Sequence, residues 1–306
     1  MFWLYEEDLP PGAGGEPFGA AHLAYLVIFL ALSACYALFY RRLDGGRRKS
    51  ADRVLGSLVF FCGLFEYGVT ALLGRFSLYT LPIHVCSLMF SLTLLHAWTN
   101  AARSGSFAAR LHDFLGAALF HPGILGVWAA LLFPDWLDVP FWNYLSVSGF
   151  LVHGLVSVYG ASIIVKDAEA ADPKGLFRRD LISSALFMTV GALVMFFFDR
   201  TTGANYWFMA WPSAGSPLTG AYVCGGFGGY LLAYTLTALA ITALWYGLRY
   251  LLFVRKPAGT RKRKRLEAIS LKAFSLFYRI APTAPTAACR AHFSKMTPPA
   301  WVGWSM

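Results

Sequence analysis

Long uninterrupted apolar runs are the feature that most constrains this chain. Each run is about as long as the 20 or so residues that a helix needs to cross a bilayer core of roughly 30 Å. Backbone groups inside a bilayer must bond internally, so only helices or closed barrels can span it, and the ten-residue alternation of barrel strands is absent here. The predicted spans are residues 21–40, 54–73, 78–98, 114–133, 142–165, 181–198 and 218–248. We therefore expect an all-α, polytopic membrane helix bundle with seven transmembrane helices.

Composition excludes an ordinary soluble domain. Only 14% of the residues are charged and 57% are hydrophobic, whereas soluble domains carry about 25% charged residues. The net charge of +10 could suggest a nucleic-acid partner. Its distribution along the chain argues against one, and we expect none.

The basic residues lie in alternate loops. Of the 26 Lys and Arg residues, all except Arg75 and Arg200 follow the first, third, fifth or seventh predicted span. Such a bias predicts that these loops are cytoplasmic. It favours seven spans over six or eight and places the N-terminus outside and the C-terminus in the cytoplasm. We expect a multi-pass protein of the cell membrane, of the bacterial inner or plasma membrane type.

Three regions follow from this topology. Residues 1–20 form an extracytoplasmic segment, which is acidic and lacks the basic start of a cleaved signal peptide. Residues 21–254 form the transmembrane domain, and residues 255–306 a basic cytoplasmic tail that we expect to be partly disordered. The run KPAGTRKRKR at 256–265 either contacts anionic lipid headgroups or serves only as a topology signal.

Titratable side chains at membrane depth are costly, and each is a functional candidate. Counting along the predicted spans at 1.5 Å per residue puts five of them in one layer about 6 Å thick. These five are Glu66, His84, Cys86, His121 and His153.

This layer predicts a catalytic pocket with Cys86 as nucleophile and a histidine as its base. His84 is two residues from Cys86, about 200° around a regular helix, so His153 or His121 is the expected base. Glu66 would orient that histidine.

Other interpretations of the same residues remain open. They could be hydrogen-bonded packing groups, a proton relay or ligand site of a transporter, or a metal site built from His84, His121 and His153. We expect no cofactor. His22 and His96 lie near span ends, where we expect their polar tips to reach water. The spacing of the cysteines predicts no disulfide framework.

Two outer loops carry candidate substrate-binding residues. The loop at 133–141 contains Asp135, and Asn143 follows it. The loop at 199–218 contains Asn205 and Tyr206 and is predicted to be either a lid over an outward-facing pocket or a segment lying in the headgroups. Its first two residues, Asp199 and Arg200, are either an ion pair or simply the end of a span.

Four sequence elements resemble the YwaF-like family of integral membrane proteins. They are Leu-Pro-Ile-His-Val-Cys at 81–86, His-Pro-Gly at 121–123, His153, and Thr-Gly-Ala-Asn-Tyr at 202–206 followed by Gly-Ser-Pro-Leu at 215–218. Eukaryotic relatives of that family look like phospholipid acyltransferases that use a Cys and a His within the membrane. The resemblance implies a lipid-active enzyme whose partners are membrane lipids. Cys86 would then accept the acyl group and His153 would act as base, with His84, His121 and Glu66 as orienting or oxyanion groups. A transporter or small-molecule-binding protein is the alternative, and a non-catalytic scaffold is the third possibility. The sequence does not indicate an oligomeric state.

Overall fold

The computed structural model of the chain describes residues 2–10, 12–100, 105–134, 136, 138–212 and 216–254. Contacts divide the chain into two units, Met1–Arg255 and Lys256–Met306. The second unit lies outside the described residues. The structure therefore does not test the role predicted for the basic tail. Everything below concerns the first unit.

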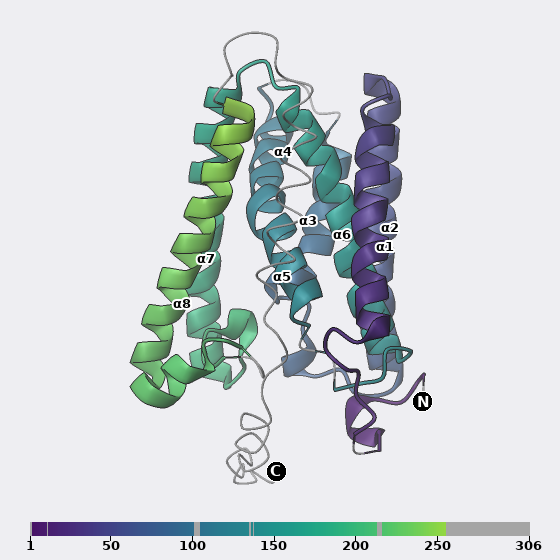
Figure 1. Cartoon of the computed structure of the whole chain (residues 1–306), viewed down its shortest axis with the longest axis vertical. Helices are drawn as coiled ribbons and strands as arrows, with labels where there is room; N and C mark the ends of the chain where they lie inside the picture. Colours follow the sequence, from purple (N-terminus) through teal and green to yellow (C-terminus); the bar gives the residue numbers. More distant parts are fainter. Residues whose placement is uncertain are drawn as a thin grey trace. The chain divides into compact units, whose positions relative to one another are not determined.

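Helices make up the regular structure of the described residues, and no strand occurs among them. Figure 1 shows the longer helices running alongside one another. The elements are the helices α1 (Ala20–Tyr40), α2 (Gly45–Leu72), α3 (Val85–Thr99), α4 (Phe107–Ala118), α5 (Val127–Leu132), α6 (Tyr144–Ala168), α7 (Pro173–Thr202) and α8 (Thr219–Arg249), the π-helices η3 (Leu119–Gly126) and η5 (Tyr250–Val254), and the short 3₁₀ turns η1 (Glu6–Asp8), η2 (Leu78–Thr80) and η4 (Tyr206–Phe208).

Six segments of the described chain are long and apolar enough to cross a membrane. They are α1, α2, the continuous run α4–η3–α5, α6, α7, and α8 with its extension. The remaining predicted span, residues 78–98, corresponds to the shorter apolar helix α3. The prediction of a polytopic helical bundle is therefore confirmed.

Local sequence explains where several helices begin. The side chains of Asp44, Ser106 and Asp172 accept bonds from backbone N–H groups in the first turns of α2, α4 and α7. Pro173 suits the start of α7 because its missing N–H would be unsatisfied there anyway. Pro122 has the opposite effect inside the fourth span, where it removes one helical donor. The chain forms the wider π-helix η3 at this point.

The third span begins later than predicted. We expected helix from residue 78 with Pro82 in its first turn, but α3 begins at Val85. Residues 78–84 form the turn η2 and a loop instead, and His84 is the N-cap residue with extended backbone. The predicted start is therefore wrong.

Helix α6 lies at the centre of the bundle. It packs against α1, α2 and α5, and most of its residues are buried. Small residues allow this close approach: Gly154 lies against Phe29 of α1, and Gly160 against Ile124 of η3. Helices α1, α7 and α8 instead turn mostly exposed apolar side chains outward, as expected of surfaces that face lipid.

Contacts define two ends of the bundle. At one end, called the inner end here, the first half of α2 meets the ends of α3 and α6: Asp52 accepts hydrogen bonds from Asn100 and Lys166. At the other, the outer end, Arg75 forms ion pairs with Glu7 and Asp8 of the N-terminal segment. The inner end carries the loops that charge predicts to be cytoplasmic.

His22 and His96 differ from expectation because both are buried. His22 accepts a bond from the Phe18 amide and donates to the Leu131 carbonyl, so it ties α1 to α5. The ring of His96 bonds to the hydroxyl of Tyr159. These histidines hold elements together, and the prediction that their polar tips reach water is wrong.

Candidate functional site

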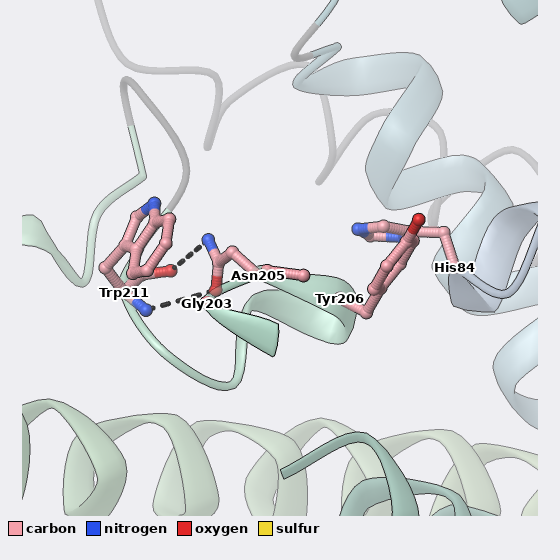
Figure 2. A pocket seen from close by; sticks show the side chains of 6 residues that line it. His84, Gly203, Asn205, Tyr206 and Trp211 are labelled. Atoms are coloured by element: carbon pink, nitrogen blue, oxygen red, sulfur yellow. Dashed lines mark hydrogen bonds between the residues drawn. The ribbon is translucent and has the colours of Figure 1, made fainter. Parts of the chain in front are cut away.

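A cavity of about 250 Å³ opens at the outer end, between the start of α3 and the loop after α7. Figure 2 shows Trp211 on one side of it and His84 on the other, with Asn205 and Tyr206 between them. The residues that line it are His84, Gly203, Ala204, Asn205, Tyr206 and Trp211.

Tyr206 joins the two halves of this cavity. Its hydroxyl accepts a hydrogen bond from the Leu81 amide and donates one to the Leu78 carbonyl, both at 2.8 Å. The neighbouring Trp207 donates from Nε1 to the Ile83 carbonyl at 3.0 Å. The segments 81–86 and 202–206, far apart in the sequence, are therefore in direct contact.

His84 differs from the other described histidines. Its ring packs against Phe208, with centroids 4.9 Å apart, and against Tyr206. The ring makes no hydrogen bond to the part of the chain that the structure describes. In each of the other five, which are His22, His96, His112, His121 and His153, a ring nitrogen is hydrogen-bonded. An imidazole that lines a cavity without a protein partner can exchange a proton with a bound molecule.

Cys86 is the second residue of α3. A helix N-terminus stabilises a thiolate through its dipole and its unpaired N–H groups. His84 makes no side-chain cap bond to those groups. Because His84 precedes the helix, the expectation from regular helical geometry that it points away from Cys86 does not apply.

His153 and Glu66 lie on the neighbouring helices α6 and α2. His153 is buried and donates from Nδ1 to the Gly149 carbonyl at 2.6 Å, which makes Nε2 the basic nitrogen of the neutral ring. Its ring lies 4.7 Å from that of Trp136. Glu66 accepts a hydrogen bond from Ser148 at 2.8 Å. The hydroxyl of Tyr67, next to Glu66, is hydrogen-bonded to that of Ser87, the residue after Cys86, at 2.6 Å.

The depth of these groups can be counted from the inner end, where Asp52 bonds to Asn100 and Lys166. At 1.5 Å per residue, Glu66 is about 21 Å along α2 from Asp52. Cys86 is the same distance along α3 from Asn100, and His153 is about 20 Å along α6 from Lys166. These three members of the predicted layer therefore lie at one depth, while their chemical roles stay predictions.

His121 lies apart from this group. Its Nε2 donates to the hydroxyl of Thr242 on α8 at 3.0 Å, because that hydroxyl already donates to Ala238. Gly123, two residues after His121, lies against the sulfur of Met89, three residues inward from Cys86. His121 is thus nearer the inner end than predicted and contacts α8.

The predicted substrate-binding residues have structural partners. The amide of Asn205 holds its own loop together: it accepts from the backbone N–H groups of Ala210 and Trp211 and donates to the Trp211 carbonyl. Asn143 caps α6 and donates to the Leu4 carbonyl. Asp135 lies outside the described residues.

Asp199 and Arg200 do not form the ion pair considered above. Asp199 accepts a hydrogen bond from the Tyr206 amide at 2.9 Å. The guanidinium of Arg200 lies over the ring of Phe227, 4.3 Å from its centroid.

Comparison with known proteins places the chain in a family. The family model described as the TMEM164 family matches residues 17–246. The chain belongs to the TMEM164 family. No curated protein and no solved structure matches it. The matched part of this TMEM164-family protein contains the whole outer site.

The sequence did not point to two buried charge clusters at the inner end of this TMEM164-family protein. Asp52 is fully buried and accepts bonds from Tyr40, Asn100 and Lys166. Arg249 on α8 pairs with Asp167 at 2.8 Å and Asp180 at 2.7 Å. The sign of these clusters in the sequence was that each contains an Asp close to the end of a predicted span and near basic residues.

A metal site has no support in the described residues. They contain no group of three or more His, Cys, Asp or Glu side chains that could hold a metal ion. His84, His121 and His153, all among these residues, therefore do not form such a group.

Proposed function

We propose that this TMEM164-family protein is a membrane-embedded, lipid-active enzyme that transfers an acyl group to or from a phospholipid, with Cys86 as the acyl acceptor and His84 as its base. The observation that supports this function is the position of His84. Its hydrogen-bond-free ring lines the outer cavity directly before the helix whose second residue is Cys86.

The reaction would proceed in two steps. The imidazole takes the thiol proton while the sulfur attacks the ester carbonyl of a lipid. The C–O bond then breaks, the lysolipid oxygen leaves with the proton from the imidazolium, and a thioester remains on Cys86. In the second step the imidazole takes a proton from the acceptor hydroxyl, whose oxygen attacks the thioester and restores the thiol.

The first turn of α3 would assist both steps. Backbone N–H groups at a helix N-terminus are placed to stabilise negative charge, whether on the thiolate or on the oxygen of a tetrahedral intermediate. Because the substrate is itself a bilayer component, its acyl chain can approach from the membrane without crossing water.

His153 is the second candidate for the base. Its Nδ1–H is fixed by the Gly149 carbonyl, so Nε2 can accept a proton, and it lies at the same depth as Cys86. Glu66 would act through Ser148, which directly precedes Gly149 on α6.

Covalent labelling tests this function. Purified protein in lipid is treated with a lipophilic activated acyl ester, and the labelled peptide is mapped. We expect thioester formation on Cys86, absent in Cys86→Ser and slowed about 100-fold or more in His84→Ala. Cys62→Ser is the matched control, since Cys62 is a free, half-buried thiol in the middle of α2.

The same experiment separates the alternatives. Slowing in His153→Ala but not in His84→Ala would transfer the role of base to His153. A folded protein that is never labelled on Cys86 would contradict acyl transfer and favour a transporter or small-molecule-binding role for the outer cavity. We propose further that the protein resides in the cell membrane and that its basic tail contacts anionic headgroups.

A further inference from the structure

Arg53 is a half-buried cation at the inner end of α2 that has no carboxylate partner. The other buried or half-buried cations of the described chain each form an ion pair with Asp or Glu; they are Arg48, Arg75, Lys166 and Arg249. Arg53 forms no such pair within the described residues, and its Nε is buried there without a hydrogen-bond partner. Keeping a guanidinium in this state is costly, which points to a ligand that supplies the missing charge.

An exposed indole holds this guanidinium in place. The guanidinium carbon of Arg53 lies 5.1 Å from the centroid of the Trp98 ring on α3. Trp98 is exposed, and its Nε1 donates to the hydroxyl of Ser57 at 3.2 Å. Because Ser57 is one turn after Arg53 on α2, the indole lies across the line where α2 and α3 meet, called the α2–α3 seam here. A guanidinium stacked on a ring keeps the edge that binds the oxygens of an anion.

The position of Arg53 corresponds to the headgroup level of a bilayer. The two helices are in close contact just beyond it, since a Cβ on Gly56 would lie 2.7 Å from that of Ala97. Exposed apolar side chains follow on the same helices, and they are Val54, Leu58, Phe61 and Leu95. Arg53 directly precedes this apolar surface. Trp is enriched at this depth, and Arg extends its cation from here to the headgroups.

A second cation lies one turn before Arg53 on α2. Lys49 is exposed, and its side chain has no partner among the described residues. Like charges four residues apart on a helix repel each other, and an anion between them removes this repulsion. Asp52, the acid next to Arg53, is buried in the bundle and bonds to Asn100 and Lys166 instead. The described chain therefore gives Lys49 and Arg53 no counter-charge.

We propose that the inner end of the α2–α3 seam binds an anionic phospholipid. Its phosphate lies between Arg53 and Lys49, and its acyl chains cover the exposed apolar side chains beyond Trp98. A guanidinium binds phosphate oxygens through two parallel N–H bonds, which adds geometric specificity to the attraction. A lipid fits better than a free phosphate, because burial of the adjoining apolar surface adds to its binding.

This lipid is separate from the proposed reaction. Cys86 lies twelve residues before Trp98, which is about 18 Å along α3, toward the outer end. The inference therefore does not depend on acyl transfer, and the two can fail separately.

Native mass spectrometry of the full-length protein tests the proposal. The protein is reconstituted in nanodiscs that contain equal amounts of phosphatidylglycerol and phosphatidylcholine, then released into detergent, and the retained lipids are identified. We expect phosphatidylglycerol to be retained about fivefold or more over phosphatidylcholine, whose own ammonium group opposes the two cations. Equal retention of the two lipids, or retention of neither by folded protein, would overturn the proposal.

Matched variants locate the site on α2. Arg53→Gln removes one cation and should lower the retention of phosphatidylglycerol about fivefold. Arg110→Gln, an equal loss of charge at an exposed position of α4, should leave retention close to that of the parent protein. The basic tail is present in both variants, so a difference between them belongs to α2. Equal retention by Arg53→Gln and the parent would contradict the proposal.

Two further measurements complete the experiment. Lys49→Gln changes an exposed side chain and keeps the bundle intact, so it tests the site even where Arg53→Gln fails to fold, and we expect about threefold lower retention. Excess inorganic phosphate should leave the lipid bound, because phosphate cannot cover the apolar surface. Displacement by phosphate would mean that the site takes a free anion, and it would overturn the assignment of a lipid. Cys86→Ser should retain phosphatidylglycerol like the parent protein, and a loss of retention there would contradict the separation of the two sites.

Discussion

Asp52 shows how a charged residue is accommodated inside this bundle. The carboxylate is fully buried, yet Oδ2 accepts bonds from the Tyr40 hydroxyl at 3.0 Å, Asn100 at 2.7 Å and Lys166 at 2.9 Å. These donors come from α1, the end of α3 and α6. With three donors, one of them cationic, the buried carboxylate connects these helices. Without the cation it would be an uncompensated buried charge, which destabilises the folded state.

This contrast predicts non-additive effects at the inner end. Lys166→Met removes the cation and should lower the free energy of unfolding by about 2 kcal/mol. This loss is smaller than for a fully buried ion pair, because Lys166 is partly exposed. Adding Asp52→Asn removes the orphaned charge, so the double variant should be more stable than Lys166→Met alone. Denaturant unfolding in mixed micelles measures both. Additive losses would show that the two side chains do not interact.

Glu169 offers a test by pH, since it lies after α6 in the inner loop. The hydrogen bond from Arg48 lowers the pKa of the Glu169 carboxyl from its ordinary value. A folded-state pKa that is depressed adds stability above the unfolded pKa, and that stability is lost as the pH falls through the folded pKa. The melting temperature of the parent should therefore exceed that of Glu169→Gln at pH 7, and the difference should shrink toward pH 4. A difference that grows on acidification would contradict this sign.

Single residues also show what the sequence could and could not supply. Titratable residues within apolar runs could be identified directly, and Glu66, Cys86 and His153 do lie at one depth. Their partners could not be identified, because they come from distant segments: Tyr159 for His96, Thr242 for His121 and Leu131 for His22. Only these hydrogen bonds distinguish the other histidines from His84, whose ring has no hydrogen bond to the described residues.

At the scale of elements, the spans were predictable and their local breaks were not. The apolar runs correspond to the observed helices because length and hydropathy suffice to define a span. The delayed start of α3 depends on a loop more than 120 residues later, since Tyr206 and Trp207 bond to the backbone of residues 78–83. The π-helix η3 could have been suspected from Pro122 alone.

Close packing of α6 against α1 leads to a prediction at this scale. A Cβ on Gly154 would overlap the buried ring of Phe29, whereas a Cβ on Gly68 of α2 would meet nothing within 4 Å. Both glycines are inside helices, so alanine brings the same gain in helix propensity at each. We expect Gly154→Ala to lower the free energy of unfolding by about 1–3 kcal/mol and Gly68→Ala to leave it unchanged or slightly higher. Equal effects of the two changes would mean that the α1–α6 contact does not limit stability.

At the scale of the whole molecule, the two ends differ in the chemistry that joins their elements. The inner end is held by buried ion pairs, such as Asp52 with Lys166 and Arg249 with Asp167 and Asp180. At the outer end the ion pairs of Arg75 are exposed, and the buried contacts include aromatic hydroxyls and indoles bonded to backbone, as in Tyr206 and Trp207. Within the described residues, the cavity therefore lies at the end with few cations.

This asymmetry also predicts which way the bundle crosses the membrane. Cytoplasmic loops hold most Lys and Arg because translocating them is unfavourable. Among the basic residues that the structure describes, only Arg75 and Arg200 belong to the outer end. In a variant with all native cysteines replaced by alanine, single cysteines can be placed at two exposed positions, Glu16→Cys before α1 and Lys174→Cys at the start of α7. In intact cells an impermeant maleimide should label the cysteine at position 16 at once, and the one at position 174 only after permeabilisation. The reverse pattern would invert the topology and place the outer cavity in the cytoplasm. Labelling of both in sealed cells would mean that the charge bias does not fix a single orientation.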